Sequence, residues 1–309
     1  MDEAPLVTCI IPTYNRSNLV CMAIDSIIKQ TYQNWELLVI DDQSNDDTWD
    51  IINKYSLIDK RIICYRNPVK GANNARNLGI EKARGEYIAF LDDDDVSLPH
   101  RFASQVNAMI THKSRFLVSW HEVRDRGSNK LIRSEKTIFT GSAIGFPSRW
   151  MIEKSLLLEV GGFDPAMTAM QEIELSHRLA TKYTFDYHDD VVSVMYFSSQ
   201  STSQGRNGNL GKIQLLQKAG HLMFPEEKAY WAFSVALWYV CKNDYGRALT
   251  YYQTSAGGIR SLMKAKPLFK CIAYLFTLIK SGAIGARVIT KLITFEFPNL
   301  VKHRIIPSD

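Results

Sequence analysis

Short apolar runs alternate with helical patterns in the first part of the chain, and this alternation limits the possible folds more than any other feature. Four apolar runs have the length and composition of buried strands, at residues 6–11, 35–40, 61–65 and 87–91. Between them, apolar residues recur at helical spacing over 19–30, 49–55 and 72–83. Strands separated by such helices form βαβ units with right-handed crossovers. The sequence therefore predicts an α/β fold on a mostly parallel sheet flanked by helices.

Small polar and acidic residues follow three of these strands at the point where each strand ends. They are Pro12–Asn15, Asp41–Ser44 and Asp92–Asp95. Open parallel sheets bind their ligands outside the carboxyl ends of the strands. Crowded carboxylates repel by about 1 kcal/mol per close pair unless a cation or solvent screens them, and Mg²⁺ is a suitable counter-charge. The cluster thus predicts a metal and diphosphate site; the alternative is a solvated loop in which Asp95 caps the next helix.

Composition and cysteine spacing exclude several classes of protein. Hydrophobic residues make up 46% and charged residues 22% of the 309 residues, which is typical of a globular chain. The longest apolar stretch, Ala229–Cys241, is too short for a membrane span. The first residues lack the pattern of a secretory signal, so we expect a cytoplasmic protein. The five cysteines show neither zinc-ligand spacing nor a disulfide framework.

Positive charge is concentrated at the end of the chain. Residues 260–309 hold nine Lys and Arg against two acidic residues, so this segment carries +7 and the rest −2. A basic tail indicates an anionic partner surface, and nucleic acid, membrane headgroups and an acidic substrate all fit. Apolar runs interleaved with lysines over 260–306 are typical of an interfacial helix. The alternative is a helical bundle with a solvated basic face.

The pattern changes along the chain in a way that predicts two domains. From about residue 116 it becomes mixed, with a hairpin-like segment at 121–136, and from about residue 210 it is helical. A run rich in Gly and Asn at 204–212 is the best candidate linker. We therefore predict a domain over 1–205 and a basic helical region over 206–309.

Several blocks together resemble one known family. They are the segments 11–16, 35–44, 71–79 and 83–95, with Pro99 after them. In order and spacing these blocks resemble the family 2 glycosyltransferases with the GT-A fold, over roughly residues 5–205. The resemblance implies a GT-A catalytic domain, a nucleotide-sugar donor, a divalent metal such as Mn²⁺ or Mg²⁺, and inversion at the anomeric carbon.

The same resemblance implies roles for individual residues. Pro12, Tyr14 and Asn15 would form a loop beside the nucleobase, and Asp42 would contact uracil. Arg76 would contact nucleobase or phosphate. Asp92 and Asp93 would contact ribose and sugar, and Asp94 would be a direct metal ligand. For Asp42 the alternative is a helix cap, and for Arg76 it is a surface arginine. The family often has a histidine a few residues after a tyrosine such as Tyr196, and this chain has Phe-Ser-Ser-Gln there.

The segment from Gly161 to Leu179 resembles the part of the family that holds the acceptor-side base. The family usually has a Glu-Asp pair, and this chain has Gln171-Glu172, so the catalytic position falls on Glu172 and the next acidic position on Glu174. The longer carboxylate keeps the chemistry of a general base. The alternative is an ordinary acidic first helical turn.

The resemblance therefore implies an inverting, metal-dependent glycosyltransferase. It would move a sugar from a nucleotide donor, of UDP type, to a hydroxyl of a glycan acceptor, and the family suggests a lipid-linked intermediate of surface polysaccharide, as in O-antigen or capsule. A sugar-1-phosphate nucleotidyltransferase and a non-catalytic glycan or nucleotide binder are the alternatives. We expect no nucleic-acid partner, and we expect peripheral association with the inner face of the cell membrane through residues 260–306.

Overall fold

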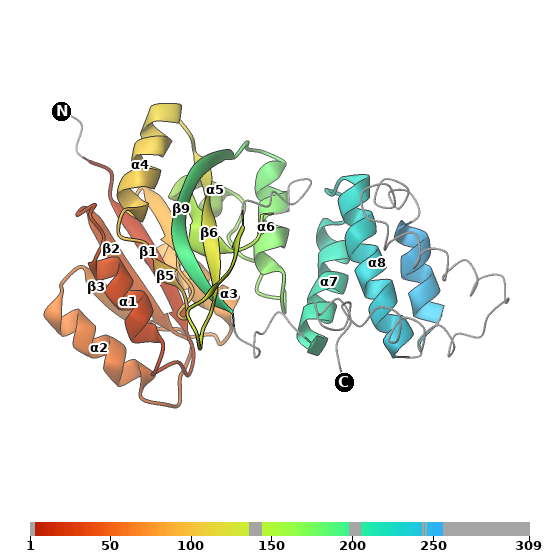
Figure 1. Cartoon of the computed structure of the whole chain (residues 1–309), viewed down its shortest axis with the longest axis horizontal. Helices are drawn as coiled ribbons and strands as arrows, with labels where there is room; N and C mark the ends of the chain where they lie inside the picture. The colour runs from red at the N-terminus through yellow and green to blue at the C-terminus, as the bar shows by residue number, and fades with distance from the viewer. Residues whose placement is uncertain (1–3, 136–143, 198–204, 243, 245, 256–309) are drawn as a thin grey trace. The chain divides into compact units, whose positions relative to one another are not determined.

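The computed structural model describes residues 4–135, 144–197, 205–242, 244 and 246–255. The chain divides into two compact units (Figure 1). The first unit comprises Met1–Ile138, Ile144–Ala166 and Arg178–Ser199, and the second comprises Phe139–Ala143, Met167–His177 and Gln200–Asp309. The predicted division into 1–205 and 206–309 stays a prediction.

The first half of the first unit alternates strands and helices, as the sequence predicts. The elements in chain order are β1 (Val7–Thr13), α1 (Val20–Ile28), β2 (Trp35–Asp41), α2 (Thr48–Ile58), β3 (Ile62–Arg66), α3 (Ala72–Lys82) and β4 (Tyr87–Phe90). The four strands are parallel and lie in the order β3-β2-β1-β4. Because they are parallel, their carboxyl ends meet at one edge of the sheet.

The second half of the unit extends this sheet with both parallel and antiparallel strands. Its elements are β5 (Val96–Ser97), α4 (Arg101–His112), β6 (Phe116–Asp125), β7 (Leu131–Glu135), η1 (Pro147–Arg149), β8 (Trp150–Glu153), α5 (Lys154–Glu159) and β9 (Asp186–Phe197). The sheet order is β3-β2-β1-β4-β8-β6-β9-β5, with β7 paired to β6. β8 is antiparallel to β4 and β6, whereas β9 is parallel to β6. The sheet is therefore mixed, and the predicted hairpin at 121–136 is confirmed as β6–β7.

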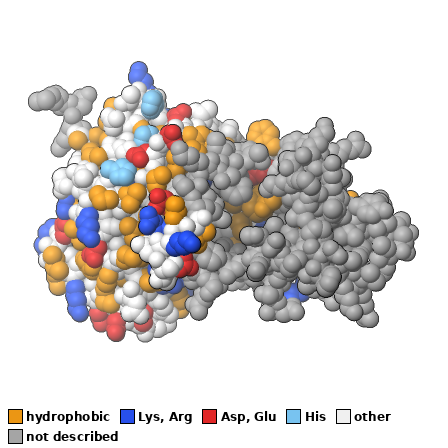
Figure 2. Space-filling view, viewed as in Figure 1, with side chains coloured by type: hydrophobic (Ala, Val, Ile, Leu, Met, Phe, Trp, Pro, Cys, Tyr) orange, Lys and Arg blue, Asp and Glu red, His pale blue; other side chains and the backbone are white. Residues whose placement is uncertain are grey.

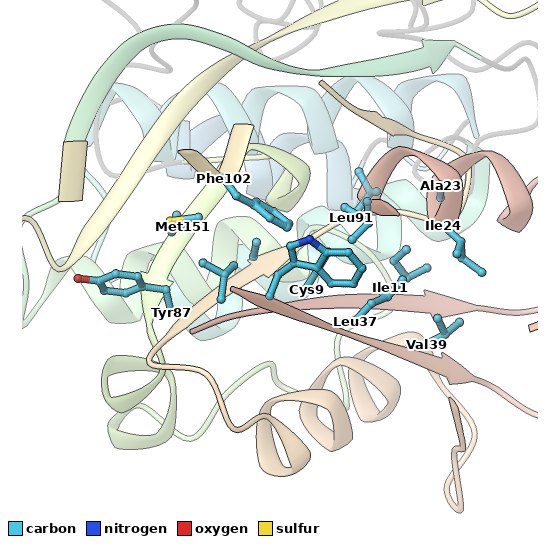
Figure 3. Packing of buried hydrophobic residues seen from close by; sticks show 14 of the residues in the cluster. Cys9, Ile11, Ala23, Ile24, Leu37, Val39, Tyr87, Leu91, Phe102 and Met151 are labelled. Atoms are coloured by element: carbon cyan, nitrogen blue, oxygen red, sulfur yellow. The ribbon is translucent and has the colours of Figure 1, made fainter. Parts of the chain in front are cut away.

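Apolar side chains of β1 and β2 form the core together with α1, α2 and α4. Figure 3 shows alternate residues of the two strands, such as Cys9 and Leu37, packed near Ile24 and Phe102. All of these side chains are fully buried, and burial of an aliphatic or phenyl side chain such as Leu37 or Phe102 contributes about 1.5–3 kcal/mol. α3 lies on the opposite face, where a Cβ on Gly79 would come within 2.5 Å of Ile10. Only glycine permits this close approach of helix and sheet.

Glu36 is a buried carboxylate near the start of β2, where an apolar residue would be expected. It accepts hydrogen bonds of 2.7 Å from the Thr8 hydroxyl and from both the main-chain N–H and the Nε of Arg84. Burial alone would raise the pKa of Glu36, but these hydrogen bonds outweigh it, so its pKa lies below the usual value. The ionised carboxylate thus ties β1 and β2 to the segment before β4.

α3 also fixes the segment that contains the glycine pair. Asn77 donates to the carbonyl of Phe163 at 2.8 Å and accepts from the Phe163 N–H at 2.8 Å, and Asn73 donates to the carbonyl of Asp164 at 2.9 Å. Gly162 has a φ of 67°, and a Cβ there would lie 2.5 Å from the Asn77 amide oxygen. The block at 71–79 therefore holds residues 162–164 in place.

The second unit is helical where it is described. It contains the first part of α6 (Gln171–Ala180), α7 (Gly205–Ala219) and α8 (Pro225–Cys241). An apolar cluster includes Ile173, Leu215 and Trp231, and the buried His177 Nε2 lies within hydrogen-bond distance, 2.8 Å, of Glu227 Oε1. The predicted linker at 204–212 is wrong, because its residues from Gly205 onward form α7.

The prediction of an interfacial segment falls on residues 260–306, which lie outside the described residues. Within the described part of the chain, no helix has both the length and the apolar character required to cross a membrane.

Candidate active site

The predicted donor-site residues meet at the carboxyl ends of β1, β2 and β4. Thr13, the last residue of β1, donates its hydroxyl hydrogen to Asp93 at 2.8 Å. The carbonyl of Thr13 accepts a hydrogen bond of 2.8 Å from the N–H of Asp42. The end of β1 thus joins the loop after β2 to the aspartate loop, Asp92–Asp95, as the parallel sheet predicts.

Asp42 is buried and organises the turn between β3 and α3. Its Oδ1 accepts from the Asn67 amide at 2.7 Å and from the Gly71 N–H at 2.8 Å, and its Oδ2 lies 2.9 Å from the same N–H. Gly71 has a φ of 131°, which favours glycine. Asp42 does not cap α2, since α2 begins at Thr48 and Asp46 accepts from the Thr48 N–H.

The loop after Pro12 leads into α1 through an unusual main-chain conformation. Asn15 has a φ of 51°, its N–H donates to the Ser44 hydroxyl at 2.9 Å, and its side-chain oxygen accepts from the Asn45 N–H at 2.8 Å. Tyr14 is partly exposed, and its hydroxyl accepts from Lys70 Nζ at 3.0 Å. The predicted nucleobase loop is therefore tied to the loops after β2 and β3.

Three arginines from different parts of the chain lie near the aspartate loop. Asp92 pairs with Arg76 of α3 at 2.8 Å, and Asp93 lies 3.9 Å from Arg16. Asp94 Oδ2 lies 3.7 Å from Arg126 of the β6–β7 turn. These contacts partly neutralise a cluster whose like charges would otherwise repel.

Burial makes ionisation of the aspartate loop costly. It raises the pKa of Asp93 to about 7, despite the hydrogen bond from Thr13. Burial also raises the pKa of Asp94, with a further contribution from the charge of Asp92. Asp95 is fully enclosed and accepts from the Ser148 hydroxyl at 2.8 Å, and burial raises its pKa well above the usual range. Asp95 is thus part of the loop's internal structure, which excludes a role as a cap of the next helix.

The aspartate loop fits a metal that is bound largely through phosphate oxygens. Among the described residues, no three His, Cys, Asp or Glu side chains converge as a metal site. Mg²⁺, however, takes only one or two carboxylates and completes its shell with phosphate oxygens and water. Asp94 suits this role because its side chain is 28% exposed and its carboxylate lies 3.7 Å from Arg126, too far for a hydrogen bond.

Arg76 is buried, so the alternative of a surface arginine is wrong. Its Nη2 donates to Asp92, its guanidinium lies 5.5 Å from the centroid of the Phe163 ring, and its Nε and Nη1 are enclosed without a hydrogen-bond partner in the described structure. In this arrangement Arg76 acts on the site by fixing Asp92. Its predicted contact to nucleobase or phosphate stays a prediction.

Glu172 and the aspartate loop belong to different units. Glu172 lies in the first turn of α6 and is partly exposed, whereas Glu174 is 4% exposed. The catalytic role of Glu172 stays a prediction. Residues 198–200, where the family often has a histidine, lie outside the described residues.

The sequence reasoning missed Asn67, Arg16 and Arg126. Asn67 follows β3 just as Asp42 follows β2, so the rule that ligands bind at the carboxyl ends of strands could have found it. Arg16 stands in a quoted motif, but nothing in the motif indicates a contact with Asp93. Arg126 lies far along the chain in a charged hairpin and carries no sequence signal.

Known proteins share both the sequence blocks and the fold. Part of the chain is 45% identical over 115 residues to the "UDP-Glc:alpha-D-GlcNAc-diphosphoundecaprenol beta-1,3-glucosyltransferase WfaP" of Escherichia coli, covering 37% of this chain and 45% of that protein. Another enzyme of the same description, WfgD of Escherichia coli, is 37% identical over 142 residues, covering 45% of this chain and 55% of that protein. The matches thus span about half the length of these relatives.

One further relative and one solved structure match a larger part of the chain. The "Putative colanic acid biosynthesis glycosyl transferase WcaA" of Escherichia coli K12 is 30% identical over 200 residues, covering 59% of this chain and 69% of that protein. The crystal structure of S. aureus TarS 1-349 in complex with UDP superposes with a TM-score of 0.62 over 89% of this chain and 91% of that one. At 16% identity this likeness concerns the fold, which is GT-A. The sequence profile of Glycosyl transferase family 2 matches residues 8–168, which is just over half of the chain, and the chain belongs to this family.

Proposed function

We propose that this chain is an inverting, metal-dependent glycosyltransferase that moves a sugar from a UDP-sugar to a hydroxyl of a lipid-linked glycan. The observation that carries the proposal is the meeting of Asp42, Thr13 and the aspartate loop at one edge of the sheet. Relatives named as UDP-Glc-dependent enzymes acting on a diphosphoundecaprenol-linked sugar support the choice of donor and acceptor. A role in surface-polysaccharide synthesis is supported by the names of WcaA and of the "Putative teichuronic acid biosynthesis glycosyltransferase TuaG" of Bacillus subtilis.

In the proposed mechanism the first unit holds the donor. Asp42 offers its Oδ2 to the N–H of uracil, with Tyr14 and Asn15 beside the base, while Asp92 and Asp93 contact ribose and sugar. Asp94 would hold Mg²⁺ or Mn²⁺, which when bound neutralises charge on the leaving diphosphate.

Glu172 supplies the second part of the mechanism as a general base. It takes the proton from the acceptor hydroxyl as that oxygen attacks the anomeric carbon, and the bond to the diphosphate breaks on the opposite side of the carbon. A single displacement inverts the centre. The proposed catalytic domain is 1–205, with 206–309 as the basic helical region.

The test is release of nucleotide from UDP-, GDP- and dTDP-sugars, with and without a diphosphate-linked N-acetylglucosamine lipid, in Mn²⁺ or Mg²⁺. We expect UDP release that depends on the acceptor and a product of inverted anomeric configuration. Binding of UDP without turnover on any acceptor would favour a non-catalytic binder. Formation of UDP-sugar from UTP and a sugar-1-phosphate would identify a nucleotidyltransferase.

We also propose that residues 260–306 attach the protein to the inner face of the membrane that carries the acceptor. The support is the charge of +7 over 260–309, since each basic residue near an anionic surface contributes about 1 kcal/mol. The coloured face of the first unit in Figure 2 instead mixes Lys and Arg with Asp, Glu and apolar side chains. Flotation with anionic and neutral vesicles tests this, and equal binding to both would contradict the electrostatic attachment.

A further inference from the structure

Arg126 reaches the aspartate loop from a distant part of the sheet. It follows Asp125, the last residue of β6, and its Nη2 donates to the main-chain carbonyl of Asp94 at 2.8 Å. The same atom lies 3.7 Å from Asp94 Oδ2. One guanidinium thus contacts both the main chain and the carboxylate of the predicted metal ligand.

The surroundings of Arg126 hold it in this position. Its guanidinium lies 5.2 Å from the centroid of the Tyr196 ring on β9. The turn that carries it is closed by Asp125, whose Oδ1 accepts from the N–H and hydroxyl of Ser128 at 2.8 Å. Arg126 is therefore presented to the loop by two strands and an ordered turn.

The two contacts of Arg126 differ in strength. The bond to the Asp94 carbonyl has ideal length, whereas 3.7 Å to the carboxylate is an ion pair without a hydrogen bond. The Nε and Nη1 of Arg126 have no hydrogen-bond partner within the described ranges, and the side chain is 28% exposed. The carboxylate can therefore turn away while the carbonyl bond keeps the guanidinium beside the loop, with donors available to an anion.

We propose that Arg126 is the resting counter-ion of Asp94, that it competes with the metal for this carboxylate, and that it contacts the donor diphosphate once the metal has taken Asp94. The part concerning the diphosphate rests on the proposed function. In this proposal Arg126 opposes metal binding at Asp94 while the donor is absent, and it couples metal binding to donor binding.

The test measures Mn²⁺ binding to the full chain by electron paramagnetic resonance, first without nucleotide. We expect Arg126→Gln to bind Mn²⁺ about two- to fivefold more tightly than the wild type, because a partly exposed ion pair of this kind has been removed. With UDP present, the gain in Mn²⁺ affinity should be smaller in Arg126→Gln than in the wild type. Arg126→Lys, which keeps the charge, should lie between the two proteins.

Arg124→Gln is the matched control. Arg124 lies two residues earlier on β6 and binds Glu122 at 2.7 and 2.9 Å, so this change should leave Mn²⁺ affinity unchanged. Unchanged or weaker Mn²⁺ binding in a folded Arg126→Gln protein would overturn the proposed competition. Wild-type protein that binds Mn²⁺ but not UDP would contradict the proposed function and leave the competition for Asp94 to be judged on Mn²⁺ alone.

Discussion

Exchanging Asp42 and Asn67 separates the structural role of Asp42 from its proposed role in binding uracil. In the wild type, Asp42 accepts from both the Asn67 amide and the Gly71 N–H. Asp42→Asn alone places the new amide NH₂ group, a donor, against either the Asn67 amide or the Gly71 N–H, which are donors too. Asn67→Asp alone places two buried carboxyl groups where the oxygen and nitrogen are now 2.7 Å apart, so one of them must keep its proton.

The magnitude follows from the bonds that are lost. A hydrogen bond to a charged group contributes about 1.5–3 kcal/mol, and about 1 kcal/mol shifts Tm by about 2–4 °C in a domain of this size. Each single variant should therefore lower Tm by about 3–12 °C. In the double variant, the amide introduced at position 42 can donate to the carboxylate introduced at position 67 while its oxygen accepts from the Gly71 N–H, so most of this loss should be recovered.

The assay pairs thermal unfolding with calorimetric titration of UDP. We expect the double variant to regain stability but to bind UDP at least about tenfold more weakly than the wild type, because the carboxylate is no longer at position 42. Wild-type UDP affinity in the double variant would refute the assignment of Asp42 to uracil. Failure to regain Tm would show that the contact with Asn67 does not stabilise the turn.

Three further outcomes are expected. Glu172→Gln should lower turnover by at least ~10²-fold with little change in UDP affinity, because a base acting on the acceptor proton affects only the transition state. The control variant Glu174→Gln should stay active. An inactive Glu174→Gln beside an active Glu172→Gln would assign the base to Glu174. Asp94→Asn should abolish turnover without unfolding the protein, and full activity in excess EDTA would contradict the metal requirement. Glu36 has a lowered pKa in the folded state, so the stability that it contributes is present above its unfolded value of 4.5 and is lost as the pH falls through the folded value. Glu36→Gln should therefore differ most from the wild type in Tm at neutral pH, and a difference that stays equal down to about pH 3 would contradict this account.

The parallel half of the sheet could be predicted because each of its strands is a continuous apolar run between helices. The observed β1 to β4 and α1 to α3 agree with the predicted segments to within a few residues. Residues that follow these strands, such as Asp42 and Asp93, could be predicted to meet for the same reason. The rule that ligands bind at the carboxyl ends of the strands works here because the parallel topology alone brings these positions together.

Contacts that depend on the second half of the sheet could not be predicted. β8 inserts between β4 and β6, and Arg126 reaches Asp94 only because β6 and β9 then lie in the same sheet. The guanidinium of the buried Arg76 lies over the ring of Phe163, which is distant in sequence. The Gly and Asn run after residue 204 indicated a linker, but it forms the start of α7, where Gly211 packs so close to Ala169 that a Cβ would lie 2.7 Å from it. Glycine is needed at this position for close packing, whereas the sequence pattern alone indicated a loop.

The hydrogen bonds between α3 and residues 162–164 have a consequence for recombining family members. Asn73 and Asn77 bind the main chain of Phe163 and Asp164, and Gly162 leaves space for the Asn77 side chain. Two sequence blocks that are more than eighty residues apart therefore behave as one cassette. A chimera that takes its acceptor-side region from a relative should have its crossover before α3 or after residue 164. A crossover between α3 and residue 164 would combine Asn73 and Asn77 of one protein with the 162–164 segment of another.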